Sequence, residues 1–415
     1  MGASGVICEF NPFHGGHAYL LSRMREQVGD EGCVVCLMSG RFVQRGEVAV
    51  ADPYLRAEMA LAGGADLVLE LPFPWSAGSA EHFAAAGVGL LSRMGVESIT
   101  FGSECGKYDL LSHAAKTPAD PRFGDIYASL CRKGAGTAAA YAEALRLVSE
   151  ERGHPLPEGF PSSNDLLGIA YLRALNEFSD QHGHAPEATV IPRLGAGYRE
   201  ETLHTDGYPS ATAIRLLLRE ASCDPYALEA MLTGAMPKEA LEVLLDGIRH
   251  GMAPLEGERL LSFYHTLYRL KKPSDMESYA EWGGGLAGHI CRHAEASPNP
   301  AEFFRALRTK QYTDARLRRA LLFGATGVTE ADLREAPAYT TLLAANRRGC
   351  AYLKARQKTC GDKDDSALTV VTKPADAPRG RQQELRELSD ALFTLCFPVA
   401  AGAGEMLRRS PLILP

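Results

Sequence analysis

The first 28 residues contain the feature that most restricts the possible folds. Residues 6–10 form a short apolar run that is typical of a buried strand in a parallel sheet. Asn11-Pro12 interrupts this run. Apolar residues then recur with helical spacing, at Leu20, Leu21, Met24 and Val28. The pattern predicts a strand, a tight turn and a helix that begins near Gly16.

The predicted turn contains two histidines, His14 and His17. Two imidazoles three residues apart at a helix start can point in the same direction. A helix N-terminus offers free N–H groups and a positive dipole end to an anion, and Gly15 and Gly16 let a bulky phosphate approach the backbone. The alternatives are a pair of surface histidines or half of a metal site, although zinc needs further ligands at matching spacing.

Strands and helices alternate after this unit. Further strands are predicted at residues 33–38, 66–71, 98–101 and 188–192, and helices at residues 53–62, 80–94, 165–178 and 210–220. This order is typical of βαβ units that build a parallel sheet, so the expected fold class is α/β. Ligands of such sheets bind at the carboxyl ends of the strands.

Several polar residues directly follow predicted strands. Arg41 and Arg45 lie in the loop of residues 39–47 and could hold phosphates or a carboxylate; the alternative is a solvated loop. Gly102 ends another strand, where a base or ribose could contact the backbone, unless it is an ordinary strand-end glycine. Arg193 follows the last of these strands.

Two later helix starts are further candidate sites. Asn164 precedes a predicted helix and either caps it or reaches a ligand. Ser210 is a suitable N-cap for the helix that continues through Thr212 and Arg215. The start of that helix is a second candidate anion site, and the alternative is a plain capped helix.

From about residue 224 the pattern changes to amphipathic helices, with examples at residues 237–248, 258–270, 301–307 and 314–323. In this part only residues 367–372 resemble a strand. A chain of 415 residues suggests two or three domains. We therefore expect a nucleotide-binding domain at residues 1–223 and a mainly α-helical domain at residues 224–415.

One part of the helical region is locally basic. Its cationic residues, which have Tyr312 among them, are Arg305, Arg308, Lys310, Arg316, Arg318 and Arg319. Basic side chains with an interleaved aromatic suit an RNA backbone and unstacked bases, and the alternative is a solvated helix face. The net charge of −7 excludes a uniformly basic nucleic-acid binder but not a local basic face.

Composition limits the cellular setting. No run of about 18 apolar residues is present, so no membrane span is predicted. No signal peptide is expected, because the first strand begins within a few residues. The ten cysteines are scattered, which favours free thiols. Cys33 and Cys36 form a CxxC pair, but their spacing within a strand directs the two sulfurs to opposite faces. The expectation is a cytoplasmic enzyme.

Residues 14–17 resemble the HxGH signature of the nucleotidylyltransferase superfamily. Its Rossmann-like, HUP-type fold also occurs in class I aminoacyl-tRNA synthetases. In that superfamily the histidines contact the phosphates of ATP and stabilise the transition state at the α-phosphorus. The resemblance implies this catalytic role for His14 and His17.

Over most of its length the chain is similar to one family, the bacterial tRNA(Met) cytidine acetate ligases. The matching segments are Glu9–His17, Met38–Gly46, Asp66–Pro72, Phe101–Glu104, Arg193–Tyr198, Ser210–Arg215 and Lys310–Arg319. Asn164 matches an asparagine-containing loop of the family, but Asp165 stands where asparagine is frequent, so either residue could contact ATP. Gln311 replaces a residue that is commonly basic in the family.

The resemblance implies roles for individual residues. ATP would be bound by Ile7, Cys8, Glu9, Phe10, Asn11, Pro12, Phe13, His14, Gly15, Gly16, His17, Ala18, Tyr19, Leu20, Gly102, Asn164, Arg193, Ser210, Thr212 and Arg215. The six basic residues at positions 305–319 would contact tRNA. ATP would be the co-substrate and Mg²⁺ its companion, and no metal-binding residue is implied.

The implied reaction has two steps. Acetate attacks the α-phosphorus of ATP and pyrophosphate leaves, which gives acetyl-adenylate. The amine of the wobble cytidine in elongator tRNA(Met) then attacks the acyl carbon, which gives N4-acetylcytidine and AMP. Neither a membrane nor a stable protein partner is implied.

Two other functions compete with this one. An adenylyltransferase for a small phosphorylated metabolite shares the HxGH signature, but the long helical region with its basic patch argues against it. An ATP-sensing or RNA-binding scaffold would need no catalysis, and the intact His14 and His17 argue against that function.

Overall fold

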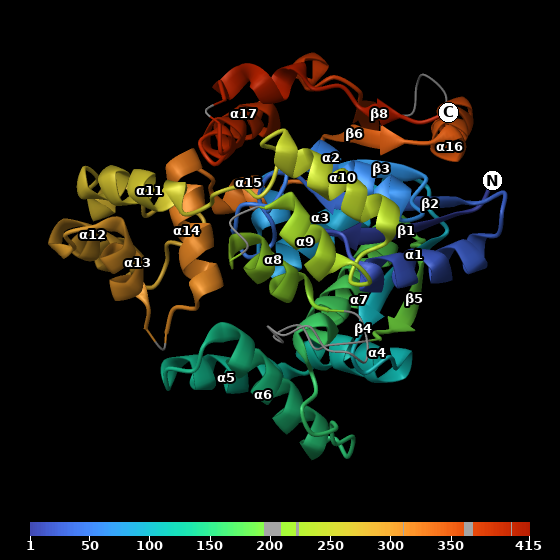
Figure 1. Ribbon diagram of the computed structural model, residues 1–415. Helices are drawn as coiled ribbons and strands as arrows, with labels where there is room; N and C mark the ends of the chain where they lie inside the picture. The colour runs from blue at the N-terminus through green and yellow to red at the C-terminus, as the bar shows by residue number, and fades with distance from the viewer. Residues whose placement is uncertain (195–208, 221–223, 310, 361–367, 400) are drawn as a thin grey trace.

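In a computed structural model, residues 1–194, 209–220, 224–309, 311–360, 368–399 and 401–415 are described. Within these residues the strands form one mixed, eight-stranded sheet (Figure 1). Seven strands follow the order β5-β4-β1-β2-β3-β6-β7, and the eighth, β8, pairs with β6 outside this order. The strands are β1 (Ala3–Cys8), β2 (Cys33–Ser39), β3 (Leu67–Leu71), β4 (Ser98–Ser103), β5 (Glu187–Pro192), β6 (Tyr339–Ala345), β7 (Thr369–Val371) and β8 (Leu412–Ile413).

The first five strands are parallel, as the sequence predicts. β1 pairs with β2 on one side and with β4 on the other, so the strand order reverses at β1. In open α/β sheets such a reversal opens a ligand-binding crevice at the carboxyl ends of the two central strands. The predicted extension of the first strand to Phe10 is wrong, because Phe10 has a left-handed φ of 44° and leaves the strand geometry.

Helices cover both faces of this sheet and form most of the chain after residue 224. They are α1 (Gly15–Val28), α2 (Pro53–Ala62), α3 (Ala80–Arg93), α4 (Tyr108–Lys116), α5 (Pro121–Arg132), α6 (Thr137–Glu151), α7 (Ser163–His182), α8 (Ala211–Glu220), α9 (Pro225–Leu232), α10 (Lys238–Arg249), α11 (Arg259–Arg269), α12 (Leu286–Ala296), α13 (Pro300–Leu307), α14 (Asp314–Thr326), α15 (Glu330–Arg334), α16 (Arg347–Cys360) and α17 (Arg381–Thr394). No helix of the described residues combines the length and apolarity needed to cross a membrane.

The pleat of β2 divides the core into two parts. Cys36 belongs to the apolar core shared with α1, α2 and the later helices, whereas Cys33 belongs to the core shared with α3 and α7. The two sulfurs therefore lie on opposite faces of the sheet, as their spacing predicts. Figure 1 shows α11–α14 as a separate group beside the sheet, with the α5–α6 pair below it.

The helical region departs from expectation in one respect. The prediction that only residues 367–372 form a strand after residue 224 is wrong, because β6 pairs antiparallel with β3 and extends the main sheet. β6 is buried along its whole length, so its run of Tyr, Thr, Leu and Ala lacks the alternation that marks a half-exposed strand. One sheet therefore contains strands from both parts of the chain. The division into two domains, at residues 1–223 and 224–415, stays a prediction.

A buried ionic cluster joins α17 to the sheet. Arg41 pairs with Glu70 of β3 and with Asp390 of α17, and Arg386 lies 3.4 Å from the Glu70 carboxylate. All four side chains are at most 4% exposed. The hypothesis that Arg41 holds a ligand is therefore wrong, because its guanidinium is enclosed by two carboxylates of the protein.

We expect the Glu70→Ala variant to lose about 3–5 kcal/mol of unfolding free energy, because it leaves two buried guanidinium groups short of a negative charge. The measurement is chemical denaturation followed by circular dichroism. Glu26→Ala is the matched control, since the Glu26 side chain is 59% exposed beside Arg23 and its removal should cost less than about 1 kcal/mol. Equal losses in the two variants would contradict the importance of the cluster.

Candidate active site

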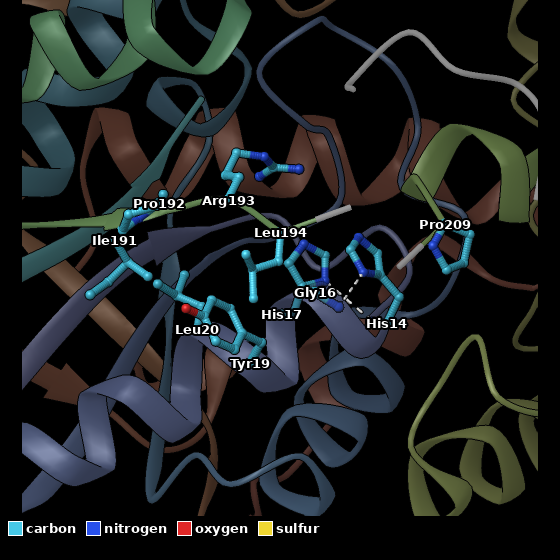
Figure 2. Close-up of a pocket in the computed structure, with 11 residues that line it drawn as sticks. His14, Gly16, His17, Tyr19, Leu20, Ile191, Pro192, Arg193, Leu194 and Pro209 are labelled. Carbon is cyan, nitrogen blue, oxygen red and sulfur yellow. Dashed lines mark hydrogen bonds between the residues drawn. The ribbon is translucent and has the colours of Figure 1, made fainter. Parts of the chain in front are cut away.

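The turn between β1 and α1 brings the two histidines into contact. His14 is the N-cap of α1, and its Nδ1 accepts the N–H of Gly16 at 3.0 Å. The Nδ1 of His17 in turn accepts the backbone N–H of His14 at 3.3 Å. These reciprocal bonds form a capping box built from imidazoles instead of the usual Ser or Thr with Glu. The rings stack with centroids 3.8 Å apart (Figure 2), so the prediction that they point in the same direction is confirmed.

This arrangement determines the protonation of both rings. Because each Nδ1 accepts a hydrogen bond, each neutral ring carries its proton on Nε2 and can donate it to a ligand. Burial, with the nearby Arg193 and Arg215, lowers the pKa of His14 to about 3. Burial and the adjacent His14 also lower the pKa of His17 well below its ordinary value. At neutral pH the pair therefore presents two uncharged N–H donors.

A pocket opens beside the two imidazoles at the reversal point of the sheet. Its lining residues are His14, Gly16, His17, Tyr19, Leu20, Gly102, Ile191, Pro192, Arg193, Leu194 and Pro209. In Figure 2, Arg193 extends from the end of β5 on the opposite side of this pocket from Tyr19 and Leu20. A side-chain carbon at Gly102 would lie 3.2 Å from Cγ of Arg193, so a larger residue there would crowd the pocket.

Most other residues predicted to bind ATP build the turn instead of lining the pocket. Ile7 is buried against α3, where a side-chain carbon at Gly87 would lie 2.6 Å from it. Phe10 and Phe13 are buried and pack edge to face. The Asn11 side chain accepts the N–H of Val50 at 2.7 Å. The remaining members of the turn and of the start of α1 that do not line the pocket are Cys8, Glu9, Pro12, Gly15 and Ala18. Outside the turn, Asn164, Ser210, Thr212 and Arg215 are also absent from the pocket lining.

The expected role of the α1 backbone in anion binding is wrong for its first turn. The N–H of Gly15 donates to the carbonyl of Ala235 at 3.0 Å, and that of Gly16 donates to His14. The N–H groups of His17 and Ala18 both donate to the His14 carbonyl. The protein therefore satisfies these donors itself, which leaves the imidazole Nε2–H groups to face a ligand.

Glu104 connects three of the predicted residues. Its carboxylate accepts from the Asn164 side chain and from the hydroxyl of Ser162, both at 2.5 Å, and lies 3.8 Å from Nε of Arg193. Ser162 caps α7, so the alternative that Asn164 is the cap is wrong. Asn164 therefore stands within one group of polar side chains together with Arg193.

The neighbouring Asp165 is already occupied. It is buried, and one oxygen accepts from Ser103 at 2.6 Å and from the N–H of Cys105 at 3.1 Å. Its other oxygen accepts the N–H of Ser162 at 3.0 Å. Of the two candidates, Asn164 is the one whose side chain is free to exchange its partner for a ligand.

The start of α8 approaches the same turn. Ser210 accepts the N–H of Ala213 at 3.1 Å, which confirms its predicted capping role. Arg215 donates to the carbonyl of Asn11 at 2.8 Å and to the hydroxyl of Thr212 at 3.1 Å. Since Pro209 lines the pocket, the N-terminus of α8 and its cap lie at the pocket edge.

The basic residues of the helical region have different surroundings. Arg319 and Arg316 lie 2.7 and 3.6 Å from the Glu281 carboxylate, and Arg318 pairs with Glu47 at 2.9 Å. Arg308 pairs with Asp314 at 2.7 Å but keeps a side chain that is 53% exposed. Arg305 has the most exposed side chain of the five predicted basic residues that the structure describes, at 75%. Lys310 lies outside the described residues.

Four pocket residues were not predicted from the sequence. Ile191, Pro192 and Leu194 flank Arg193, and Pro209 precedes Ser210. Apolar residues have no chemical feature that marks them as ligand contacts. These four could have been predicted only because they are close in sequence to the predicted contacts Arg193 and Ser210. The structure adds apolar walls to a site that the sequence described only by its polar groups.

We expect His14 and His17 to remain neutral from pH 8 to pH 5, because burial lowers the pKa of both. The measurement is ¹⁵N NMR of histidine side chains, which should report a protonated Nε2 and an unprotonated Nδ1 for both rings. His14→Gln and His17→Gln variants assign the two signals. Protonation of either ring near pH 6.5 would contradict the proposed capping arrangement.

Comparisons with known proteins agree with this geometry. Residues 1–403 match the model of the family described as HIGH Nucleotidyl Transferase. The tRNA(Met) cytidine acetate ligase of Acetivibrio thermocellus is 30% identical, with 99% of each chain covered. The corresponding enzyme of Syntrophotalea carbinolica is 34% identical over 86% of this chain and 83% of that protein.

Two solved structures have the same fold. Crystal structures of Thermotoga maritima TmcAL, in an apo form and bound with alpha-thio ATP, superpose with TM-scores of 0.87 and 0.84. Both are 27% identical to this chain and cover all of it and all of their own length. The chain therefore belongs to the HIGH nucleotidyl transferase family and, within that family, to the tRNA(Met) cytidine acetate ligases.

Proposed function

We propose that this enzyme is a ligase that uses ATP to activate acetate and transfers the acetyl group to the wobble cytidine of elongator tRNA(Met), giving N4-acetylcytidine. The observation that carries the proposal is the stacked pair His14 and His17, whose neutral Nε2–H groups face a pocket at the reversal point of the sheet. The full-length similarity to tRNA(Met) cytidine acetate ligases supports the choice of substrates and does not favour an adenylyltransferase for small metabolites.

The first step forms acetyl-adenylate. An oxygen of acetate attacks the α-phosphorus of ATP, and pyrophosphate leaves with the electron pair of the broken P–O bond. Negative charge then develops on the phosphoryl oxygens. His14 and His17 donate hydrogen bonds to these oxygens, and Arg193 supplies a positive charge from the end of β5. The proposal places the nucleoside beside Gly102, which lines the pocket, and near Asn164, which is bonded to Glu104.

The donor arrangement favours this step because it is formed in advance. The capping box fixes both imidazoles before ATP binds, so no reorganisation is needed as charge develops. Neutral donors also avoid the cost of burying two adjacent positive charges. Arg215 keeps the turn in place through its bond to the Asn11 carbonyl.

We also propose that Mg²⁺ binds to the triphosphate of ATP. Within the described ranges, no group of three His, Cys, Asp or Glu side chains could hold a metal ion. Mg²⁺ is commonly bound through phosphate oxygens and water, and we infer that it enters with ATP in that form. A cytoplasmic site of action belongs to the same proposal, because ATP and tRNA are present there.

We expect the His14→Ala and His17→Ala variants to form acetyl-adenylate about 10²–10³ times more slowly than the wild type, the usual loss for one such donor. The measurement is acetate-dependent exchange of labelled pyrophosphate into ATP. Glu26→Ala, an exposed change on the same helix, is the control. Near-normal exchange in both histidine variants would remove them from the mechanism.

Mass spectrometry of tRNA nucleosides tests the complete reaction. Incubation with ATP, acetate and tRNA should yield N4-acetylcytidine, and omission of acetate should abolish it. Productive turnover only with a phosphorylated metabolite would support the adenylyltransferase instead.

The exposed basic residues are the better candidates for tRNA contacts. We expect Arg305→Ala to weaken tRNA binding and to lower the slope of log affinity against log salt by about 0.7–0.9, since one phosphate contact is lost. Arg319→Ala should instead lower the melting temperature, because Arg319 is 13% exposed and bonded to Glu281. Filter binding at several salt concentrations and thermal melts distinguish the two effects. An unchanged salt slope in Arg305→Ala would contradict its assignment.

A further inference from the structure

The carboxyl edge of the sheet has two sides, because the strand order reverses at β1. Gly102 and Arg193 lie on the side of β4 and β5. The loop of residues 39–47 follows β2 and lies on the other side. An acyl-adenylate has its nucleoside on one side of the phosphorus and its acyl group on the other. From the proposed position of the nucleoside beside Gly102, we infer that the acyl carbon faces the loop after β2.

Glu9 stands at this second side. It directly follows β1, and its Oε1 accepts the backbone N–H of Gln44 from the loop at 3.1 Å. Among the described residues, no cation lies within 4 Å of its carboxylate to form an ion pair, and Gln44 is its one hydrogen-bond partner. The residue as a whole has intermediate exposure, and among the described residues its second oxygen has no hydrogen-bond partner, so we infer that this oxygen can meet a substrate.

The loop itself is held from two directions. Arg45 reaches the hydroxyl of Ser163 at the start of α7, at 3.4 Å. Glu47 pairs with Arg318 of α14 at 2.9 Å, and Gly46 packs so closely on α14 that a side-chain carbon there would lie 2.7 Å from the Arg319 nitrogen. These contacts fix Gln44, and with it the orientation of the Glu9 carboxylate.

We propose that Glu9 is the catalytic base that accepts the proton of the cytidine amine during acetyl transfer, an inference that rests on the proposed function. The amine nitrogen attacks the acyl carbon and forms the C–N bond. The proton of that nitrogen passes to the free oxygen of Glu9, and the C–O bond to the phosphate breaks, so that AMP leaves with the bonding electrons. Glu9 then releases the proton to solvent.

Other carboxylates at this edge are less suited to the role. Glu104 lies on the nucleoside side, where it accepts hydrogen bonds from Ser162 and Asn164. Glu47 is paired with Arg318. Glu9 combines a position beside the acyl group with an oxygen that the protein leaves accessible.

The charges around Glu9 set the expected pH dependence. The titratable groups that face it are Arg45 and Glu47 of the loop, Arg56 of α2, Tyr171 of α7, Arg215 of α8 and Cys8 of β1. Burial raises the pKa of Glu9 above its ordinary value, although the Gln44 N–H, Arg215 and Arg45 act in the opposite direction. A base must be unprotonated, so acetyl transfer should rise with pH through this pKa and then level off.

The experiment separates the two steps in the full-length enzyme. Acetate-dependent exchange of pyrophosphate into ATP measures adenylate formation. Single-turnover transfer from preformed acetyl-adenylate to tRNA, followed as N4-acetylcytidine, measures the second step. The variants are Glu9→Gln and Glu9→Asp, and Glu26→Gln is the matched control on the surface of α1.

We expect Glu9→Gln to slow acetyl transfer by about 10²–10⁴-fold more than it slows pyrophosphate exchange, with loss of the pH-dependent rise in transfer. Glu9→Asp should recover part of the transfer rate, since it retains a carboxylate. Equal losses in exchange and transfer would overturn the proposal, because Glu9 would then serve ATP binding. Unchanged transfer would overturn it too. Wild-type enzyme without acetate-dependent exchange would overturn the proposed function itself.

Discussion

The buried guanidinium of Arg56 organises the edge of the sheet on which the site is built. It is fully buried, and it donates to the carbonyls of Glu9 at 2.6 Å, Ser39 at 2.9 Å and Ala51 at 3.1 Å, as well as to that of Gly40. Burial lowers its pKa to about 10, which is still above neutral, so the group keeps its charge. One side chain from α2 thus joins the ends of β1 and β2, where the chain leaves the sheet and backbone carbonyls would otherwise lack partners.

This support explains how the turn after β1 tolerates an unfavourable backbone. Phe10 adopts a left-handed φ of 44°, which costs a residue with a bulky side chain about 1–3 kcal/mol. The bond from Arg56 to the Glu9 carbonyl fixes the chain just before it, and burial of Phe10 against Phe13 and His17 fixes the side chain. The same turn that contains the strained Phe10 backbone also directs His14 and His17 into the crevice.

Local sequence patterns predicted the parts of the structure that depend on near neighbours. The strand, turn and helix around His14, the common direction of the two imidazoles and the cap at Ser210 all arise from residues within a few positions of one another. The enclosure of Arg41 could not be predicted, because Glu70 and Asp390 approach it from distant parts of the chain. The occupied N–H of Gly15 has the same explanation, since its acceptor is Ala235. In each case a polar group that seemed available to a ligand was satisfied by a long-range contact.

Long-range contacts also change the interpretation of the basic residues of α14 as an RNA-binding cluster. In the sequence, Arg316, Arg318 and Arg319 form one cationic cluster, but in the structure Glu281 and Glu47 neutralise them and leave them 13–33% exposed. A surface charge attracts RNA only where solvent and phosphate can reach it. Arg318 instead attaches the helical region to the loop after β2 through Glu47, and that loop contacts Glu9 through Gln44. Arg316 and Arg319 pair with Glu281 inside the helical region. The helical region is therefore linked to Glu9 through that loop, and the exposed Arg305 and Arg308 stay the proposed contacts for a nucleic acid.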